Sequence, residues 1–439
     1  MAITDIYIDK YRRILERADT IKINGKVTDV IGLIIVSIGP SVSLGEICTV
    51  TDRSGAEVCM TEVVGFKDGK VLSIALGEVE KISPSCEIMA SGRSLMIGVG
   101  EALLGRVIDG LGNPIDGKGE IICTSYRSIH REPPNPLTRK RIGNPLQTGV
   151  RSIDGLLTCG KGQRIGIFAG SGVGKSVTLG MIARNTNADI NVIVLIGERG
   201  REVREFLEKE LGEEGLRRSV VVVATSDKPA LIRMKGAFIG TTIAEYFRDL
   251  GKDVVMMMDS VTRFAQAQRE IGLTIGEPPA TKGYTPSVFA MLPKLLERTG
   301  TAEEGTITGF YTVLVDGDDM TEPIADAVRS ILDGHIVLSR KLANKGQFPA
   351  VDPLQSVSRV MSDVVSREHR KNSIAFNELL ATYKEAEDLI NIGAYVKGSN
   401  AGIDHAMSKI DQLRAYLKQD MFEKSTLDDA VSKLSTIVN

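Results

Sequence analysis

IGIFAGSGVGKSVTL, residues 165–179, decides the fold, because an apolar strand runs directly into a loop of small residues. The three glycines of this loop allow consecutive backbone N–H groups to point toward one anion. Lys175 adds a positive charge for the β and γ phosphates of a nucleotide, and Ser176 offers a hydroxyl to Mg²⁺. We expect the following residues to begin a helix whose positive N-terminal end faces the phosphates. The stretch therefore predicts a phosphate-binding loop between a strand and a helix.

The loop departs from the usual pattern at its first position. The consensus G-x-x-x-x-G-K-[ST] begins with glycine, whereas this chain has Ala169. Alanine does not freely adopt a positive φ, so we expect this variant to relax the requirement for glycine at the first position of the consensus only. The alternative is a glycine-rich turn that binds nothing. On the favoured interpretation, the nucleotide contacts are Gly170, Ser171, Gly172, Val173, Gly174, Lys175, Ser176 and Val177.

Length and charge limit the class of protein. A chain of 439 residues is long enough for two to four domains and a large core. Its formal net charge of −2 argues against a general polyanion binder, so we expect no specific nucleic-acid partner. No apolar run approaches the roughly 18 to 20 residues that span a bilayer, and charges interrupt the N-terminus where a signal peptide is apolar. We therefore expect a cytoplasmic protein.

The cysteines and histidines suggest no metal centre. The five cysteines include no C-x-x-C pair, and the four histidines are scattered singly. Neither set is typical of a metal site or a disulfide framework. We expect most of the cysteines to be small buried apolar side chains.

The N-terminal part divides into a helix and a strand-rich region. Residues 6–21 carry apolar side chains at helical spacing, which predicts a short amphipathic helix within 1–22. A helix this short is marginal alone, so it either packs on its own domain or waits for a partner. In residues 23–95, short β-branched runs separated by glycines favour a small closed β-barrel.

The remaining chain predicts a sheet domain and a helical domain. Residues 96–371 begin with a connector rich in turn residues and prolines, and then alternate apolar strands with helices. That alternation predicts a parallel sheet flanked by helices. Residues 372–439 show helical stretches alone and predict a separate all-helical domain. Within 96–371 we expect strands at 192–197, 219–226, 254–259 and 310–316, and a helix at 229–250.

Two carboxylates follow predicted strands. Asp259 ends the strand VVMMM, where a carboxylate can hold Mg²⁺ beside Ser176. Glu198 follows VIVLIG, at the carboxyl end of another strand, where ligands gather in open α/β sheets. Glu198 is well placed to polarise an attacking water, but an ion pair with Arg199 or Arg201 explains it equally well.

A fourth candidate is Arg359, at the end of PAVDPLQSVSR, residues 349–359. An arginine distant from the phosphate-binding loop in sequence can reach the γ-phosphate of a neighbouring subunit and stabilise the transition state in trans. Spacing alone does not establish this role. An isolated arginine is more often a solvated or structural cation.

PAVDPLQSVS, residues 349–358, resembles the signature shared by the subunits of rotary ATP synthases and the type III secretion ATPases. The resemblance extends over nearly the whole chain. INIGAYVKGSN, residues 390–400, is most similar to the flagellar protein export ATPases, with the injectisome ATPases as the alternative. Three stretches resemble the secretion branch: EPIADAVRSILDGHIVLSR (322–340), GEPPATKGYTPSVFAMLPKLLERTG (276–300) and GERGREV (197–203).

The resemblance implies a central RecA-like P-loop domain in a homohexamer, with ATP and Mg²⁺ bound between subunits. It makes Lys175 and Ser176 the phosphate and Mg²⁺ contacts, Asp259 the Mg²⁺ carboxylate, Glu198 the catalytic carboxylate and Arg359 the finger in trans. Two further residues, Phe348 and Arg199, join the nucleotide contacts. Phe348 falls where relatives place an aromatic ring against adenine, and its alternative is ordinary core packing.

The family also implies partners. The N-terminal helix resembles a segment that holds a dimeric stator protein with a regulatory role. The loop GEPPATKGY and the C-terminal helices are expected to line a pore that receives a coiled-coil stalk protein, export chaperones and substrates. Delivery to membrane proteins of an export gate implies peripheral association with the inner face of the cell membrane.

Two other classes of protein fit less well. A non-catalytic ATP synthase subunit usually lacks the carboxylate found here at Glu198. An RNA-translocating hexameric helicase needs a basic platform with aromatic side chains in its barrel. Phe66 is the only aromatic residue within 26–94.

Overall fold

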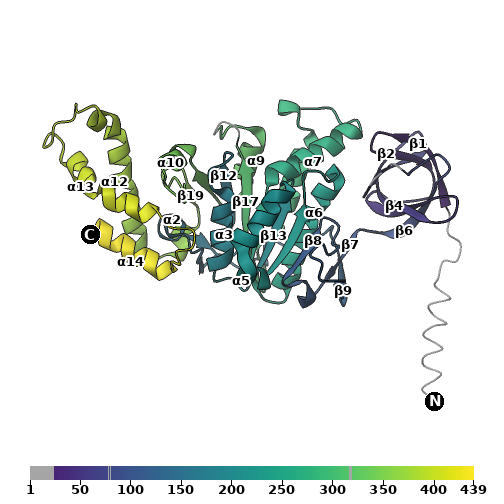
Figure 1. Ribbon diagram of the computed structural model, residues 1–439, viewed down its shortest axis with the longest axis horizontal. Coiled ribbons are helices and arrows are strands. Elements are labelled where there is room, and N and C mark those ends of the chain that lie inside the picture. Colours follow the sequence, from purple (N-terminus) through teal and green to yellow (C-terminus); the bar gives the residue numbers. More distant parts are fainter. Residues whose placement is uncertain (1–23, 78, 80, 316–318) are drawn as a thin grey trace, which may run out of the picture. The chain divides into compact units, whose positions relative to one another are not determined.

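The computed structural model describes residues 24–77, 79, 81–315 and 319–439 (Figure 1). The chain forms two compact units, Met1–Leu95 and Met96–Asn439. The amphipathic helix predicted at 6–21 lies outside the described residues and stays a prediction. Within the described ranges, no helix is both long and apolar enough to cross a bilayer.

The first unit contains a closed barrel of six antiparallel strands, which confirms the predicted small barrel. Alternate side chains along each strand point inward, and those of Val27, Ile35 and Val50 are fully buried. Cys48 and Cys86 lie in the same core. In barrel order the strands are β1 (Asn24–Ile31), β2 (Ile34–Ile38), β5 (Lys70–Ala75), β4 (Glu57–Lys67), β3 (Glu46–Thr51) and β6 (Glu87–Ser94).

The second unit is built on a nine-stranded sheet, and the strands from β18 to β8 run parallel. Parallel strands need helical crossovers that cover both faces, which explains why β13 and β14 are buried at every residue. The four strands predicted from apolar runs are present. In order they are β19 (Val357–Ser358), β18 (Gly334–Leu338), β12 (Arg164–Ala169), β17 (Thr306–Leu314), β15 (Asp253–Asp259), β13 (Ile190–Ile196), β14 (Ser219–Ala224) and β8 (Arg106–Asp109), and β16 (Gly300–Thr301) pairs with β17.

Helices cover this sheet (Figure 1). The predicted helix at 229–250 is α6, which begins after Pro229 and ends before Gly251, a glycine with φ of 78°. The helices are α2 (Arg151–Leu156), α3 (Lys175–Asn185), α4 (Gly200–Glu205), a π-helical stretch (Phe206–Leu211), α5 (Gly212–Arg217), α6 (Ala230–Asp249), α7 (Val261–Thr274), α8 (Pro286–Leu296), α9 (Pro323–Ile331), α10 (Arg340–Asn344) and α11 (Met361–Val364).

The connector contributes an edge strand that the sequence analysis did not identify. β8 lies within it and pairs in parallel with β14. Arg106 of β8 is held by Asp116, with Nε and Nη2 donating at 2.7 and 2.9 Å. A four-residue strand is too short to stand out from turn-rich sequence. Two small ladders complete this region, β7 (Met96–Val99) with β9 (Ser125–Ser128) and β10 (Pro145–Leu146) with β11 (Cys159–Gly160).

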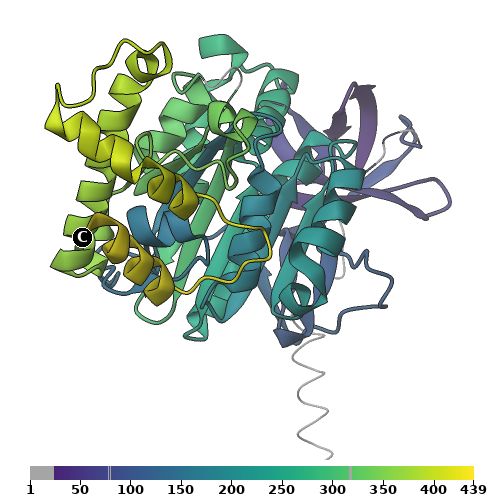
Figure 2. The ribbon, with the colours of Figure 1, turned by 60° about the vertical axis from the view of Figure 1, so that its left-hand side comes forward.

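The chain ends in three helices, α12 (Arg367–Asn391), α13 (Ala401–Leu417) and α14 (Leu427–Val438). α12 begins at Arg367, five residues before the domain boundary predicted at residue 372, because the Ser366 side chain caps it by accepting a hydrogen bond from the His369 N–H. These helices also share one hydrophobic core with the sheet, through side chains such as Phe376 and Tyr416. They are therefore packed into the same compact unit rather than folded apart (Figure 2).

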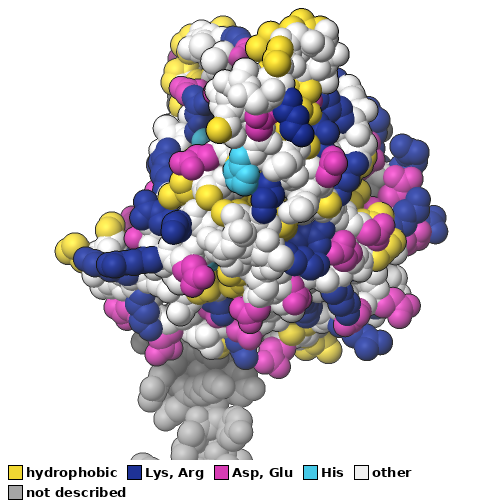
Figure 3. Space-filling model, turned by 90° about the vertical axis from the view of Figure 1, so that its left-hand side faces the viewer, with side chains coloured by type: hydrophobic (Ala, Val, Ile, Leu, Met, Phe, Trp, Pro, Cys, Tyr) yellow, Lys and Arg dark blue, Asp and Glu magenta, His cyan; other side chains and the backbone are white. Residues whose placement is uncertain are grey.

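The face made by the C-terminal helices carries charges of both signs (Figure 3). Exposed apolar side chains gather around the turn between α12 and α13, at Leu389, Ile392 and Val396. Scattered exposed apolar residues are normal on a protein surface. This face therefore shows no field of one sign that would recruit a polyanion.

A buried ion pair between Arg298 and Glu245 predicts a large loss of stability on mutation. Each side chain is 1% exposed, and Arg298 Nε and Nη2 donate to the carboxylate at 2.9 and 2.8 Å. Arg298→Ala leaves a buried carboxylate without its closest cation, so we expect the free energy of unfolding to fall by about 3–5 kcal/mol in urea titrations. Arg204→Ala, which breaks an exposed pair, is the control and should change nothing measurable. A similar effect of both variants would contradict this prediction.

Candidate active site

The phosphate-binding loop, residues 170–174, joins β12 to α3 as the sequence predicts. Gly172 and Gly174 have φ of 77° and 89°, a region that favours glycine. Ala169 instead ends β12, in register with Leu314 and Leu338. Alanine is tolerated at this position because it belongs to a strand and needs no positive φ. The loop therefore keeps glycine where the backbone requires it.

Lys175 lies between two carboxylates at the first turn of α3. Its Nζ is 2.5 Å from Asp259 Oδ1 and 3.3 Å from Glu198 Oε1. Burial acts against the charged ammonium, but the carboxylates of Asp259 and Glu198 outweigh it and raise the pKa of Lys175. Thr312 also donates to Asp259 Oδ1, at 2.7 Å. The structure thus brings together three of the predicted site residues.

Glu198 is half buried and occupies an unusual electrostatic environment. Burial, followed by the nearby charge of Asp259, raises its pKa to about 7, and Lys175 opposes this shift. The alternative ion pair with adjacent arginines is not formed, since Arg199 pairs with Glu202 and Arg201 with Glu205. Glu198 therefore faces the phosphate-binding loop rather than its neighbours in sequence.

The other predicted contacts differ in exposure. Ser171 and Ser176 are exposed at the loop and at the first turn of α3, so their hydroxyls are accessible to a ligand. Val173 is 1% exposed, so only its backbone atoms can face a nucleotide, whereas Val177 is partly buried against the core. The Arg199 side chain is 78% exposed and points toward Glu202 at 3.5 Å. Arg199 is thus not held in the cluster around Lys175.

Phe348 lies beside the phosphate-binding loop of its own chain. A Cβ atom added to Gly174 would lie 3.5 Å from Phe348 Cδ1 and 3.7 Å from Cε1. The Phe348 residue is 47% exposed, which argues against ordinary core packing. An exposed aromatic ring next to the loop offers a surface on which a planar base can stack.

Arg359 lies near the amino-terminal ends of the parallel strands, whereas the phosphate-binding loop lies at their carboxyl ends. It follows Ser358, which pairs with Gly334 at the amino end of β18, whereas Leu338 at the carboxyl end pairs with Ala169. At about 3.3 Å per residue, the four steps along the strand from Gly334 to Leu338 separate these two ends by about 13 Å. Arg359 is exposed, and its Nη1 donates to the Leu332 carbonyl at 3.2 Å. It is not brought together with Lys175 in its own chain.

The sequence analysis missed Arg263, on the first turn of α7. Its aliphatic stem packs against Gly197, where an added Cβ would lie 2.9 Å from Arg263 Cβ. Its Nη1 donates to Gln266, and its buried Nε has no hydrogen-bond partner among the described residues. The available signal was its position four residues after Asp259, within the first turn of α7. Arg263 therefore packs its stem against Gly197, the residue that precedes Glu198.

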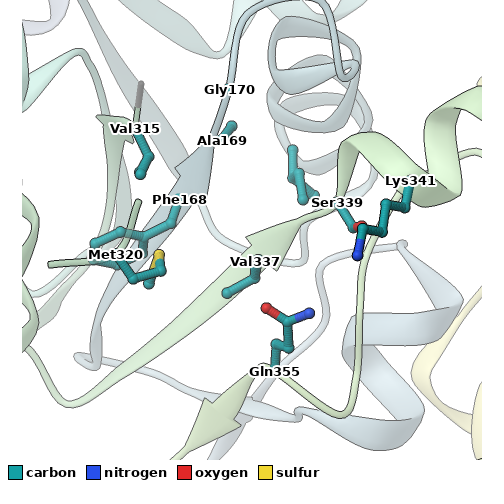
Figure 4. A pocket seen from close by; sticks show the side chains of 10 residues that line it. Phe168, Ala169, Gly170, Val315, Met320, Val337, Ser339, Lys341 and Gln355 are labelled. Carbon is teal, nitrogen blue, oxygen red and sulfur yellow. The ribbon is translucent and has the colours of Figure 1, made fainter. Parts of the chain in front are cut away.

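A small hollow of about 190 Å³ opens beside the start of the phosphate-binding loop (Figure 4). Phe168 and Met320 lie together on one side of it, and Ser339 and Lys341 lie on the other. Gln355, from the signature stretch, closes a further side. The hollow borders Gly170, the first residue of the phosphate-binding loop.

Two family models match this chain. Residues 149–358 match the nucleotide-binding domain of the ATP synthase alpha/beta family, and residues 365–436 match the C-terminal domain of the T3SS EscN ATPase. The parallel sheet, the phosphate-binding loop and these matches define a nucleotide-binding ATPase of the P-loop class.

Individual relatives identify the family. The flagellum-specific ATP synthase of Bacillus subtilis strain 168 is 58% identical over 96% of this chain and 97% of its own length. The type 3 secretion system ATPase of Xanthomonas euvesicatoria is 51% identical over 94% of each chain. The assembled ATPase EscN from enteropathogenic E. coli matches with a TM-score of 0.90 and 47% identity, over 94% of this chain and 100% of that chain. The chain belongs to the family of flagellum-specific and type III secretion ATPases, which confirms the resemblance seen in the sequence.

The raised pKa of Glu198 predicts how stability depends on pH. The folded state holds the proton up to about pH 7, whereas the carboxyl group normally titrates near 4.5. The unfolded state therefore binds fewer protons between these values, and Glu198 lowers stability as the pH rises through this window. Glu198→Gln should raise the melting temperature of the nucleotide-free protein at pH 8 and leave it unchanged at pH 4.

Differential scanning calorimetry at both pH values measures this effect. Glu208→Gln, at an exposed carboxylate, is the control for exchanging a carboxylate for an amide. An equal change in melting temperature at both pH values would show that the effect does not come from titration of Glu198.

Proposed function

We propose that this chain hydrolyses ATP at the phosphate-binding loop, with Lys175 on the β and γ phosphates and Glu198 on the attacking water. The observation that carries the proposal is the convergence of Lys175, Glu198 and Asp259 within 3.3 Å at the beginning of α3. Asp259 ends β15, Glu198 follows β13 and Lys175 follows the loop after β12, so all three lie at the carboxyl edge of the sheet, where open α/β sheets bind ligands. The backbone N–H groups of the loop supply the remaining phosphate contacts.

The residues fit a Mg²⁺ ion. Ser176 presents an exposed hydroxyl on the first turn of α3, and Asp259 presents a carboxylate that is 3% exposed. Lys175 and Thr312 both use Asp259 Oδ1, so Oδ2 has no hydrogen bond within the described residues. Oxygen ligands of this kind are the ones Mg²⁺ prefers. When bound, the ion neutralises charge that develops on the β and γ phosphate oxygens.

Glu198 has the properties of a general base for water. A pKa of about 7 places its protonation change near neutral pH, where a group that accepts a proton works well. Its neighbour Lys175 holds the carboxylate at the loop by an ion pair of 3.3 Å. Phe348 would receive the adenine ring at the other end of the nucleotide, and Arg199 would contact the nucleotide from the residue after Glu198.

A homohexamer would complete the site. Arg359 is exposed at the edge of the sheet remote from its own phosphate-binding loop, so it is free to serve the loop of a neighbouring subunit. An arginine supplied in this way stabilises the charge of the transition state. EscN has been solved both as an assembled ATPase and in complex with its central stalk EscO, which supports an oligomer and a stalk partner for this chain.

The cellular role that we propose is flagellar protein export. Several flagellum-specific relatives match over nearly the full chain, including that of B. subtilis at 58% identity. Hydrolysis would help to deliver and unload export substrates and chaperones at a membrane gate, with the protein held at the inner face of the membrane. A dimeric stator protein would bind the helix predicted within 1–22. The alternative role is injectisome secretion, which uses the same chemistry on different cargo.

Two variants separate nucleotide binding from turnover. Lys175→Ala should weaken ATP binding, because it removes the cation at the phosphates. Glu198→Gln should keep ATP bound but slow hydrolysis by about 10² to 10⁴-fold, the range for a lost acid–base group. Equilibrium binding and single-turnover hydrolysis of labelled ATP measure the two effects. Near-normal turnover in Glu198→Gln would remove Glu198 from the mechanism.

Mixing two inactive variants tests whether Arg359 acts in trans. Arg359→Ala alone should bind ATP and lose about 10³ to 10⁵-fold in rate, as for other arginine fingers. Lys175→Ala alone should also be nearly inactive. Mixed hexamers contain some interfaces with an intact Lys175 from one subunit and an intact Arg359 from the next, so activity should return. If labelled subunits prove to be mixed and activity stays absent, Arg359 acts within its own chain.

A further inference from the structure

Residues 418–426, which join α13 to α14, form a segment that we call the C-terminal link. In Figure 2 it is the yellow loop that reaches from the terminal helices toward the teal helices of the sheet. Arg184 fastens it there, since Nη2 donates to the Met421 carbonyl at 2.6 Å and the guanidinium lies 5.3 Å from the centre of the Phe422 ring. Arg184 is in the last turn of α3, the helix that begins with Lys175.

Arg151, at the start of α2, also binds the C-terminal link and the end of α13. The residue is 6% exposed. Its Nε donates to the Tyr416 carbonyl at 2.8 Å, Nη1 to Glu423 Oε1 at 2.6 Å and Nη2 to the Lys418 carbonyl. A buried guanidinium with all three nitrogens bonded has little freedom to move, because leaving any of these donors unpaired costs free energy.

Gln419 connects this anchored link to Phe348. Its side chain is nearly buried, with Oε1 accepting from the Arg151 N–H at 2.8 Å. Its Nε2 donates to the carbonyls of Gly149 and Glu423 at 2.9 and 3.0 Å. The backbone N–H of Gln419 donates to the Phe348 carbonyl at 2.9 Å. One residue therefore holds both the loop before α2 and the backbone of the half-exposed aromatic ring.

We propose that Gln419 and Arg151 are positioning residues for the nucleotide base, acting through Phe348. They fix the C-terminal link, the link fixes the Phe348 backbone, and the ring stays against the phosphate-binding loop. The inference rests on the proposed function, in which Phe348 stacks on adenine. Holding the ring in place before binding reduces the ordering cost that binding must overcome. The C-terminal helices thus set the base-dependent part of the affinity without touching the phosphates.

The test compares ATP with inorganic tripolyphosphate, which carries the same phosphates and no base. Calorimetry with Mg²⁺ and the full chain gives both dissociation constants for the wild type and for Phe348→Ala, Gln419→Ala and the double variant. Base stacking on an aromatic ring typically strengthens binding by about five-fold or more. We therefore expect Gln419→Ala to weaken ATP binding about 5- to 10-fold, with tripolyphosphate binding changed less than about two-fold. The double variant should bind ATP no more weakly than Phe348→Ala alone, because both substitutions act on the same contact, the stacking of Phe348 on adenine.

Gln163→Ala is the matched control. Gln163 is fully buried, accepts from the Gly160 N–H at 2.9 Å and donates to the Asp333 carbonyl at 3.1 Å. The Gln163→Ala variant loses a comparable number of hydrogen bonds, but at the amino-terminal ends of the strands, away from Phe348. The ratio of the ATP and tripolyphosphate constants should stay at the wild-type value in this variant. If Gln419→Ala does not fold, Gln419→Glu keeps the acceptor for the Arg151 N–H and lacks both donors.

Each outcome separates the two proposals. Equal weakening of both ligands in Gln419→Ala, an additive loss in the double variant, or the same ratio change in Gln163→Ala would overturn the inference. If Phe348→Ala weakens ATP binding and Gln419→Ala does not, the inference fails and the proposed base site stands. If Phe348→Ala leaves ATP binding unchanged, the base site fails and the inference fails with it.

Discussion

The register between neighbouring parallel strands is the constraint on which this molecule depends. Leu195 of β13 lies opposite Asp259 of β15, so Glu198, three residues further on, emerges near the end of β15. The Lys175–Asp259 contact joins residues 84 positions apart in the sequence. A shift of one residue in the pairing of β13 with β15 would send the following side chains to the other face of the sheet. The alignment of the carboxyl ends is therefore what assembles the site.

The charged side chains at the carboxyl ends of these strands can bind an anion and a cation together. Two carboxylates surround the single ammonium of Lys175, and burial makes both signs of charge expensive. Phosphate oxygens would compete with Asp259 and Glu198 for the same ammonium. A bound triphosphate would leave these carboxylates in need of another cation, which is the role that we propose for Mg²⁺ beside Asp259. Burial raises the pKa of Glu198 most, and the same crowding of negative charge, through Asp259, adds to it.

One stretch of chain, residues 348–359, runs from the carboxyl ends of the parallel strands to their amino ends. Phe348 begins it beside its own phosphate-binding loop, and Arg359 ends it at the amino end of β18. Asp352, in the middle, is buried and pairs with Lys384 of α12 at 3.2 Å. The stretch is thereby tied to the C-terminal helices, which also hold Phe348 through Gln419.

The sequence by itself predicted the barrel, the parallel sheet and the loop that ends in Lys175, because periodicity and glycine spacing are local properties of the chain. It also placed Asp259 and Glu198 after apolar strands, but it left Glu198 open between the attacking water and an ion pair with its adjacent arginines. It did not locate β8, the start of α12 or Arg263, since a short strand, a single cap and a side chain packed on Gly197 leave weak local signals. Only the tertiary structure decided that Glu198 faces Lys175 rather than its adjacent arginines, and that the terminal helices share the core of the sheet. These facts depend on contacts between residues far apart in sequence, which form only when the strands and helices pack.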